Sequence, residues 1–350
     1  MSDRLLFRVD ASTKIGMGHA MRCLALAQAW QDMGRQAIFL IAIEAPVLEE
    51  RLRSENIGIE HLSATPGTLE DAKATLRLAH QIETNWIVLD GYHFDAEYQQ
   101  IIKDAGFKLL VIDDCGYAEH YYADLVLNQN ISADENLYFN REPYTQLLLG
   151  TRYTLLRREF LQWRGWQRET PAVARKILVT LGGSDPDNVT LKVIQALQQV
   201  KIEGLEAIVV VGGSNPHYEQ LETAVQMSPF PISLKRNATN MPELMAWADV
   251  AIAAGGSTNW ELAFMGLPSL VIIIADNQQE TVDRLEKMGI VVNLGWHQDV
   301  KSSDLKNAIA SFLVKTERQH QITQLSQELV DGEGSKRVLS SLKNKEKRLG

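Results

Sequence analysis

The chain has 350 residues and a net charge of −9, and 45% of its residues are hydrophobic while 23% are charged. These values are typical of a globular protein with one large or two ordinary domains, and the negative charge argues against nucleic acid as the main partner. Apolar runs stay well short of the ~18 residues of a membrane span, the N-terminus lacks a signal-peptide core, and two cysteines form no disulfide framework or metal pair. We therefore expect a cytoplasmic protein with no membrane partner.

Apolar runs of strand length alternate with helical periodicity along the chain, which predicts an α/β fold with parallel sheets. In the first half we expect strands at residues 5–11, 36–43, 85–92, 108–114 and 124–129. Between the first two, apolar residues from Ala20 to Trp30 recur at helical spacing, and Gly34 suits the end of that helix.

A glycine-rich turn precedes this helix. Gly16 and Gly18 flank Met17 just after the first strand, as in a loop that holds a phosphate. Met21 stands where a dinucleotide fingerprint would have its third glycine. His19 falls in the first turn of the helix, where a lone histidine would be read as a residue bonded to the backbone.

Residues 151–175 interrupt the alternation, and it then restarts with expected strands at 176–183, 206–213, 232–237, 249–256 and 269–276. We therefore expect an N-terminal Rossmann-like domain over 1–165, a linker at 166–175, a C-terminal Rossmann-like domain over 176–335 and a tail at 336–350. Two doubly wound domains place their loops face to face, so the ligand is expected in a cleft between them.

The stretch AAGGSTNWELAFMGLP, residues 253–268, is the strongest nucleotide signal in the second half. Gly256 lets a diphosphate approach the backbone, and Ser257 and Thr258 add donors at the start of a helix. Glu261 lies one turn further along, where a carboxylate can bind ribose hydroxyls. The alternative is a simple capping arrangement of Ser257 or Thr258 with Glu261.

This stretch resembles the nucleotide-sugar signature of GT-B glycosyltransferases. The opening segment RVDASTKIGMGHAMRCLALA, residues 8–27, resembles the start of the UDP-2,4-diacetamido-2,4,6-trideoxy-β-L-altropyranose hydrolases. Further matches follow in order over nearly the whole chain: LDGYHFD (89–95), VIDD (111–114), LLLGTRYTLLRREF (147–160), LGGSDPDN (181–188), NMPELMAWAD (240–249), ADNQ (275–278) and DGEGSKRV (331–338).

The resemblance implies an α/β protein of GT-B architecture, with two Rossmann-like domains facing each other across a cleft. It further implies an inverting, metal-independent hydrolase without a cofactor. Such an enzyme takes a UDP-sugar and releases UDP and free 2,4-diacetamido-2,4,6-trideoxy-L-altrose for pseudaminic acid biosynthesis, with pathway enzymes as further partners.

The same resemblance assigns roles to individual residues. His19 matches the general base that activates water, a task that suits an imidazole. Tyr92 and Asn277 are expected in the catalytic set at the sugar, and Gln278 in sugar binding.

The nucleotide and substrate contacts are expected to include four further residues of the second half, Gly183, Ser184, Asn237 and Met241, together with Gly16 and Gly18. Asp113 and Asp114 are adjacent at a strand end and should point to opposite faces, so a shared metal is not expected. Asp10 and Asp90 are expected to hold loops.

Three other functions remain open at this point. A GT-B glycosyltransferase would use the same nucleotide-binding stretch at 253–268. A nicotinamide-dependent dehydrogenase built on Gly16 and Gly18 would lack its third glycine, and Glu44 lies too far on for the ribose-binding acid. A non-catalytic sugar-nucleotide binding protein would not need His19.

Overall fold

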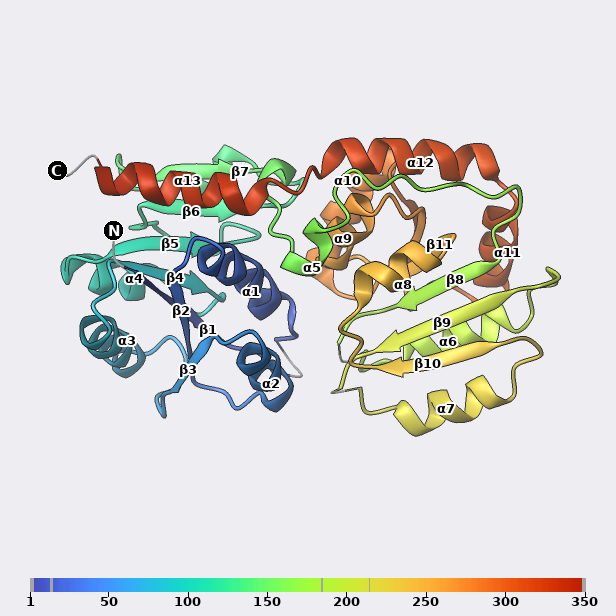
Figure 1. Ribbon diagram of the computed structural model, residues 1–350, viewed down its shortest axis with the longest axis horizontal. Helices are drawn as coiled ribbons and strands as arrows, with labels where there is room; N and C mark the ends of the chain where they lie inside the picture. Colours follow the sequence, from blue (N-terminus) through green and yellow to red (C-terminus); the bar gives the residue numbers. More distant parts are fainter. Residues whose placement is uncertain (1–2, 13–14, 184, 214, 348–350) are drawn as a thin grey trace. The chain divides into compact units, whose positions relative to one another are not determined.

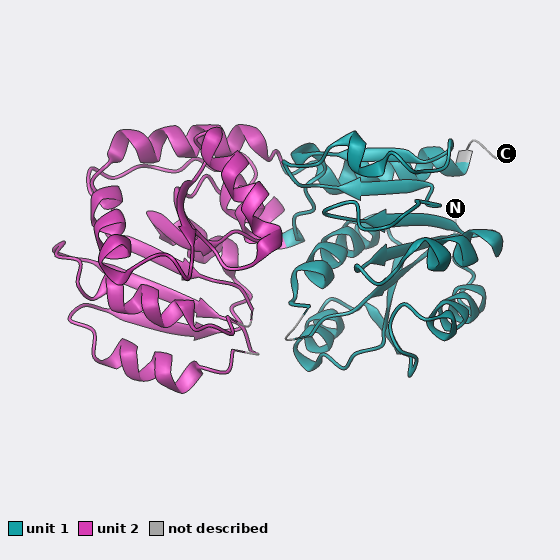
Figure 2. Ribbon diagram, turned by 180° about the vertical axis from the view of Figure 1, so that it is seen from behind, with its two compact units in different colours: residues 1–158, 332–350 teal, residues 159–331 magenta. Residues whose placement is uncertain are grey.

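The computed structural model describes residues 3–12, 15–183, 185–213 and 215–347. The chain divides into two compact units, one of residues 1–158 with 332–350 and the other of residues 159–331 (Figure 2). Each unit contains one parallel sheet flanked by helices (Figure 1).

The first unit has a seven-stranded sheet in the order β3-β2-β1-β4-β5-β6-β7. Its strands are β1 (Arg4–Val9), β2 (Gln36–Ile41), β3 (Gly58–His61), β4 (Trp86–Asp90), β5 (Lys108–Ile112), β6 (Leu125–Asn128) and β7 (Gln146–Leu149). Its helices are α1 (Gly18–Gln31), α2 (Pro46–Ser54), α3 (Leu69–Gln81), α4 (Ala96–Asp104), η1 (Glu135–Tyr138), η2 (Thr151–Tyr153) and α13 (Gly334–Lys347).

The central strands of this sheet are buried on both faces, which is why they read as continuous apolar runs. In β1, Leu5 and Phe7 pack into a core with α1, α2 and α13, whereas Leu6 packs into a second core with α3 and α4. The order of strands reverses between β1 and β4, and ligands of such sheets bind at the carboxyl ends of the strands beside this point.

The second unit repeats the arrangement with six strands in the order β10-β9-β8-β11-β12-β13. The strands are β8 (Lys176–Thr180), β9 (Glu206–Val211), β10 (Ile232–Arg236), β11 (Val250–Ala254), β12 (Ser269–Ile273) and β13 (Val292–Trp296). The helices are α6 (Val189–Leu197), α7 (Tyr218–Gln226), α8 (Met241–Trp247), α9 (Thr258–Phe264), η3 (Asp276–Gln278), α10 (Gln279–Lys287), α11 (Ser302–Leu313) and α12 (Thr316–Leu329), and α5 (Arg158–Leu161) lies where the two units join in the chain.

All ten predicted strands are present, and the α/β prediction is confirmed. Three strands were not predicted: β3, β7 and β13. Each of them is the last strand at one side of its sheet, and β3 and β13 are four or five residues long with mostly partly exposed side chains. Such strands carry little of the apolar signal that marks the central strands.

The end of the chain differs from the expected division. Residues 336–347 form most of α13 and belong to the first unit, with Val338, Leu339 and Leu342 buried in its core. A Cβ on Gly334 would lie 2.1 Å from the carbonyl oxygen of Thr154, so the backbone there packs tightly. The second unit likewise begins at residue 159, before the expected linker at 166–175.

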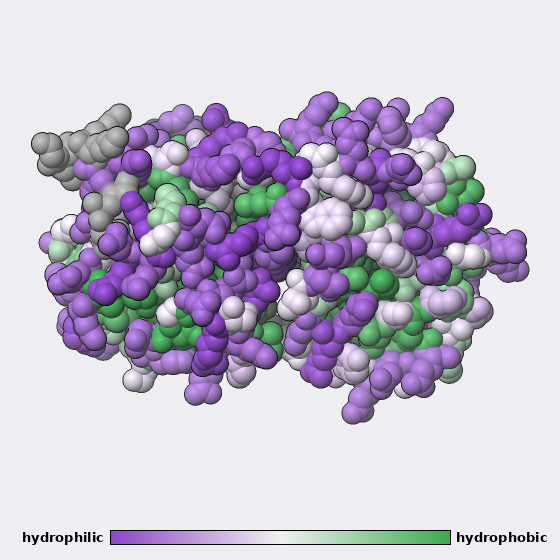
Figure 3. Space-filling view, viewed as in Figure 1, coloured by the Kyte–Doolittle hydropathy of each residue, from purple (hydrophilic) through white to green (hydrophobic). Residues whose placement is uncertain are grey.

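Polar and charged side chains cover most of the face seen in Figure 3, and hydrophobic ones gather in scattered patches. Within the part of the chain that the structure describes, no helix is both long and apolar enough to cross a membrane.

Candidate functional site

The glycine-rich turn after β1 places His19 at the start of α1. The backbone N–H of Gly16 donates to the carbonyl of Ser12 at 2.8 Å, and Gly16 has a φ of +79°, which glycine adopts without strain. Helix α1 begins at Gly18, so His19 lies in its first turn. Arg22 follows three residues later and therefore shares a face of the helix with His19.

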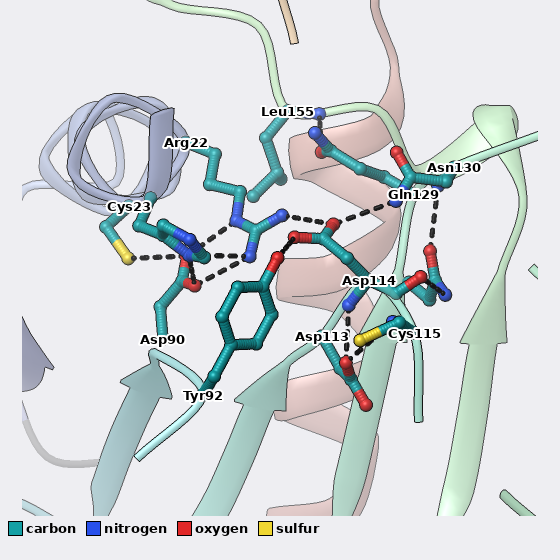
Figure 4. Close-up of polar contacts among 12 residues, drawn as sticks. Arg22, Cys23, Asp90, Tyr92, Asp113, Asp114, Cys115, Gln129, Asn130 and Leu155 are labelled. Atoms are coloured by element: carbon teal, nitrogen blue, oxygen red, sulfur yellow. Dashed lines mark hydrogen bonds and ion pairs between the residues drawn. The ribbon is translucent and has the colours of Figure 1, made fainter. Parts of the chain in front are cut away.

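A buried carboxylate at the end of β4 meets both side chains. Nδ1 of His19 lies 2.5 Å from Oδ1 of Asp90. Arg22 grips the same carboxylate with two bonds of 2.6 Å, from Nε to Oδ2 and from Nη2 to Oδ1 (Figure 4). The side chain of Asp90 is fully buried and that of His19 is 12% exposed, so Asp90 can hold the imidazole while one edge of the ring reaches solvent.

A second carboxylate follows the next strand of the sheet, β5. Asp114 accepts a bond of 2.6 Å from Nη1 of Arg22 and one of 2.8 Å from Nδ2 of Asn130, which follows β6. The hydroxyl of Tyr92 donates to Oδ2 of Asp114 at 3.1 Å, and Figure 4 shows the ring beside Arg22. The Tyr92 ring also meets the His19 ring edge-on, with centroids 5.2 Å apart.

The charges of this cluster compensate one another. Burial alone would raise the pKa of Asp90, but the charges of Arg22 and His19 and the hydrogen bonds from them outweigh it and hold that pKa below its usual value. Burial would likewise raise the pKa of Asp114, but the charge of Arg22 and its hydrogen bond outweigh this effect and lower that pKa to about 2. Both carboxylates are therefore ionised at neutral pH.

The His19–Asp90 contact fixes the arrangement of protons on the imidazole. A carboxylate oxygen and a ring nitrogen 2.5 Å apart need a proton between them, so Nδ1 carries the hydrogen. In the neutral ring Nε2 is then the acceptor. This is the arrangement of a histidine that can take a proton from water.

The neighbouring carboxylate of Asp113 has a different role. It accepts bonds from the backbone N–H groups of Cys115 and Gly116 and from the Tyr121 hydroxyl. Burial raises its pKa despite these bonds. The two adjacent aspartates thus bond different groups, as expected. Among the described residues, no group of three or more His, Cys, Asp or Glu side chains could hold a metal ion.

The other two aspartates at strand ends, Asp10 and Asp90, have different hydrogen-bond partners. Asp10 accepts from the backbone N–H groups of Ala42 and Ile43 at 2.7 and 3.2 Å, so it holds a loop as predicted. Asp90 was expected to do the same, but it bonds the side chains of His19 and Arg22.

In the second unit, two glycine-rich turns approach each other at the carboxyl ends of β8 and β9. A Cβ on Gly212 would lie 2.0 Å from the carbonyl oxygen of Gly183. One on Gly213 would lie 2.5 Å from the amide of Asn237, which itself has a φ of +52°. Asn237 therefore lies against the glycine turn, whereas Ser184 lies outside the described residues.

Met241 is the first residue of α8, and its side chain is buried. The side chain is therefore closed to a ligand, and the expected backbone contact with uracil stays a prediction.

The turn after β11 is held by amide side chains. The Gln278 carbonyl oxygen accepts from the backbone N–H groups of Gly255 and Ile274 at 3.1 and 3.0 Å. The Asn259 amide donates to the carbonyl oxygens of Ala254 and Gly256 at 3.1 and 2.9 Å. The turn is therefore rigidly placed, and one end of the Gln278 amide is committed to the backbone.

Four predicted residues lie around this turn. Ser257 precedes α9 and makes no capping hydrogen bond through its side chain, whereas Thr258 and Glu261 lie within the helix. Asn277 is exposed in η3, which begins three residues after the end of β12.

The structure thus brings His19 and Tyr92 together in the first unit, beside the turn of Gly16 and Gly18. The other predicted residues that it describes lie in the second unit, in its turns or in the helices that follow them. Arg22, Asp90, Asp114 and Asn130 were not predicted as site residues. The spacing of His19 and Arg22 on one helix face, and the aspartates at the ends of neighbouring strands, were the available signals.

Comparison with known proteins gives both a domain match and relatives over most of the chain. Residues 177–337 match the model of the glycosyltransferase family 28 C-terminal domain. The UDP-2,4-diacetamido-2,4,6-trideoxy-β-L-altropyranose hydrolase of Campylobacter jejuni is 26% identical over 83% of this chain and 98% of its own length. The spore coat polysaccharide biosynthesis protein SpsG of Bacillus subtilis is 26% identical over 96% of each chain. An archaeal relative from Methanocaldococcus jannaschii is 27% identical over 78% of this chain, which spans only 56% of that protein.

Solved structures share the architecture. MurG of Acinetobacter baumannii superposes with a TM-score of 0.67 at 15% identity, over 97% of this chain and 99% of its own. HepE of Anabaena in complex with UDP has a TM-score of 0.62 at 16% identity, over 97% and 100% of the two chains.

The chain has the GT-B fold. Each of its two units contains a parallel sheet whose strand order reverses, and the solved structures that share this architecture include MurG and HepE. Within that class the chain resembles the Campylobacter jejuni UDP-sugar hydrolase, to which it is 26% identical.

Proposed function

We propose that this protein hydrolyses a UDP-linked 2,4-diacetamido-2,4,6-trideoxy sugar with inversion at the anomeric carbon. Two relatives support the substrate class: the hydrolase of Campylobacter jejuni, and a Helicobacter pylori protein named as a pseudaminic acid cytidylyltransferase and UDP-2,4-diacetamido-2,4,6-trideoxy-β-L-altropyranose hydrolase. The observation that carries the chemistry is the contact of His19 Nδ1 with Asp90, because it leaves Nε2 as the basic nitrogen.

In this mechanism a water molecule attacks the anomeric carbon from the face opposite the diphosphate. Its oxygen forms the new bond to carbon while His19 Nε2 takes its proton, and the bond to the diphosphate oxygen breaks with its electron pair leaving on UDP. UDP is a stable anion, so it needs no acid to protonate it as it leaves. The products are UDP and the free sugar, the altrose derivative that pseudaminic acid synthesis uses.

The second unit binds UDP in this proposal. Gly183, Gly256, Ser257 and Thr258 would offer backbone and hydroxyl donors to the diphosphate, as glycine-rich turns do. Glu261 would bind the ribose hydroxyls, and the backbone near Asn237 and Met241 would contact uracil.

Three further residues would contact the sugar in this scheme: Tyr92, Asn277 and the free end of Gln278. The match to a glycosyltransferase domain over residues 177–337 supports the assignment of the nucleotide to the second unit.

The test is proton NMR of the purified protein with UDP-2,4-diacetamido-2,4,6-trideoxy-β-L-altrose and no acceptor. The proposal expects release of UDP and free sugar, with the inverted anomer appearing first and with EDTA without effect. His19→Asn should bind UDP but release no sugar. Intact substrate with the wild-type protein, or full activity in His19→Asn, would defeat it.

A GT-B glycosyltransferase is the second candidate, and the family 28 domain match favours it. A transferase would consume the UDP-sugar only when an acceptor alcohol is added. The same NMR experiment, repeated with candidate acceptors, distinguishes the two reactions.

A further inference from the structure

The guanidinium group of Arg22 connects two pairs of side chains in the first unit, Asp90 with His19 and Asp114 with Tyr92. Arg22 donates two bonds to Asp90 and one to Asp114, and its side chain is only 7% exposed. Asp90 in turn holds the ring of His19, and Asp114 accepts from the hydroxyl of Tyr92. The two proposed active-site side chains are thus connected through a residue that reaches both carboxylates.

We propose that Arg22 is a positioning residue for the hydrolysis, which fixes the His19 imidazole and the Tyr92 hydroxyl relative to each other through Asp90 and Asp114. This inference rests on the proposed function, in which His19 takes the proton of water. Arg22 itself does not touch the reacting atoms in this mechanism.

The geometry requires an arginine rather than a cation of any shape. Asp90 receives Nε and Nη2, while Nη1 goes to Asp114, so three nitrogens of one planar group serve two carboxylates. Lysine would bring the same charge as a single point and could not make these three bonds. Arg22→Lys therefore keeps a positive charge beside the two carboxylates but removes the three hydrogen bonds that position them.

Arg22 meets His19 in two ways: Nη2 lies 3.1 Å from Nδ1 of the ring, and the same nitrogen bonds the Asp90 carboxylate that holds the ring. The Asp90 side chain is fully buried, and Arg22 supplies the largest compensating charge that it meets. Without that charge, burial of the ionised Asp90 carboxylate is unfavourable, so the carboxylate takes up a proton or its side chain rotates away. Either change removes the acceptor that holds the hydrogen on Nδ1, so the ring is free to turn or to exchange tautomers.

A purely structural role for Arg22 predicts something else. In that case its removal lowers the melting temperature, but the folded fraction keeps the wild-type turnover and the wild-type imidazole signals. The decisive readouts are therefore the state of the His19 ring and the separation of kcat from KM, measured in the folded protein.

The experiment compares wild type with Arg22→Lys and Arg22→Met, and uses Lys103→Met as the matched control. Lys103 makes a partly buried ion pair of 2.6 Å with Asp124, in the same unit but away from His19. The ring nitrogens of the eight histidines are recorded by NMR, and His19→Asn identifies the His19 signals. Steady-state kinetics with the UDP-sugar and calorimetric UDP binding complete the set.

The proposal expects kcat to fall about 100-fold in Arg22→Met, the lower end of what a general base contributes, and about 10-fold in Arg22→Lys, where the positive charge is kept. UDP affinity and KM should stay within about twofold of wild type, since the nucleotide is assigned to the second unit. The His19 ring signals should show mixed tautomers in both variants and the Nδ1-protonated form in wild type and Lys103→Met.

Wild-type ring signals together with wild-type kcat in folded Arg22→Lys would overturn the proposal. If Arg22→Met fails to fold, Arg22→Lys and Asp114→Asn decide, because Asp114 contacts Arg22 but is not a hydrogen-bond partner of His19. If the wild-type protein does not hydrolyse the UDP-sugar, the proposed function fails, and the tautomer of His19 still reports separately on positioning by Arg22.

Discussion

Nδ1 of His19 lies 2.5 Å from Oδ1 of Asp90, across the point where the strand order of the first sheet reverses. His19 follows the end of β1 through a glycine turn, and Asp90 is the last residue of the adjacent strand β4. The pair therefore depends on the pairing of two strands far apart in sequence. Any change in that pairing moves the carboxylate away from the ring.

Asp90→Asn should lower kcat for hydrolysis by about 100-fold, within the range that general bases contribute. The amide can present its NH₂ group to Nδ1, which places the hydrogen on Nε2 and removes the base. Steady-state kinetics of the folded variant measure this effect. Asp10→Asn is the matched control, since Asp10 follows β1, is equally buried, and bonds Arg8 and a loop rather than His19. Equal losses of kcat in the two variants would contradict the assignment.

The pH dependence of stability should carry the signature of Asp114. Its pKa in the folded protein is about 2, below the value near 3.8 for a free aspartate, so its contribution is complete above pH 4 and is lost as the pH falls toward 2. The difference corresponds to about 2 kcal/mol of unfolding free energy. Asp114→Asn should flatten the acid limb measured by urea unfolding between pH 2.5 and 5. An unchanged slope in this variant would show that other carboxylates dominate that range.

Gly212→Ala should weaken UDP binding by at least about tenfold, equal to ~1.4 kcal/mol. The new methyl group would lie 2.0 Å from the carbonyl oxygen of Gly183, so one of the two glycine-rich turns must move. Calorimetric titration with UDP measures the change. Gly58→Ala is the control, because it adds the same group to β3 of the first unit, where it meets the flexible side chain of Ile38 at 3.2 Å. Wild-type affinity in Gly212→Ala would exclude this turn from the nucleotide site.

Leu342→Ala should destabilise the first unit by roughly 2–5 kcal/mol, the usual cost of removing a buried leucine side chain. Leu342 is 1% exposed in the core that contains α1. Thermal unfolding followed by calorimetry measures the effect on the unit. Lys336→Ala, on the exposed side of α13, should leave the melting temperature nearly unchanged. If both variants melt like wild type, α13 does not contribute to the stability of the unit.

The fold was largely predictable because nine of the ten predicted strands lie inside the two sheets and are largely apolar. Their alternation with helices predicted two parallel sheets, and only the strands at the sides of the sheets escaped notice. Helix α13 was expected as a tail because charged residues surround its buried positions Val338 and Leu342. Its partners lie in α1 and η2, over a hundred residues away, so no local pattern could have identified them.

The candidate site was predictable only in part, for a related reason. His19 and Tyr92 lie in stretches that resemble known hydrolases, and the resemblance assigned them roles. Asp90 and Arg22 are in the same stretches, but their importance comes from distances between side chains on different strands. Asp10 and Asp90 look alike in sequence, since both lie at strand ends, and only tertiary structure tells the loop-holding carboxylate from the one beside His19.

The return of α13 to the first unit also has a consequence for synthesis of the protein. A ribosome makes residues 159–331 complete before it makes the helix that closes the core of residues 1–158. The second unit can therefore fold while the first still exposes the apolar surface that Val338, Leu339 and Leu342 will cover. The first part of the chain to be translated is thus the last to be finished, and a nascent chain needs protection from aggregation over that interval.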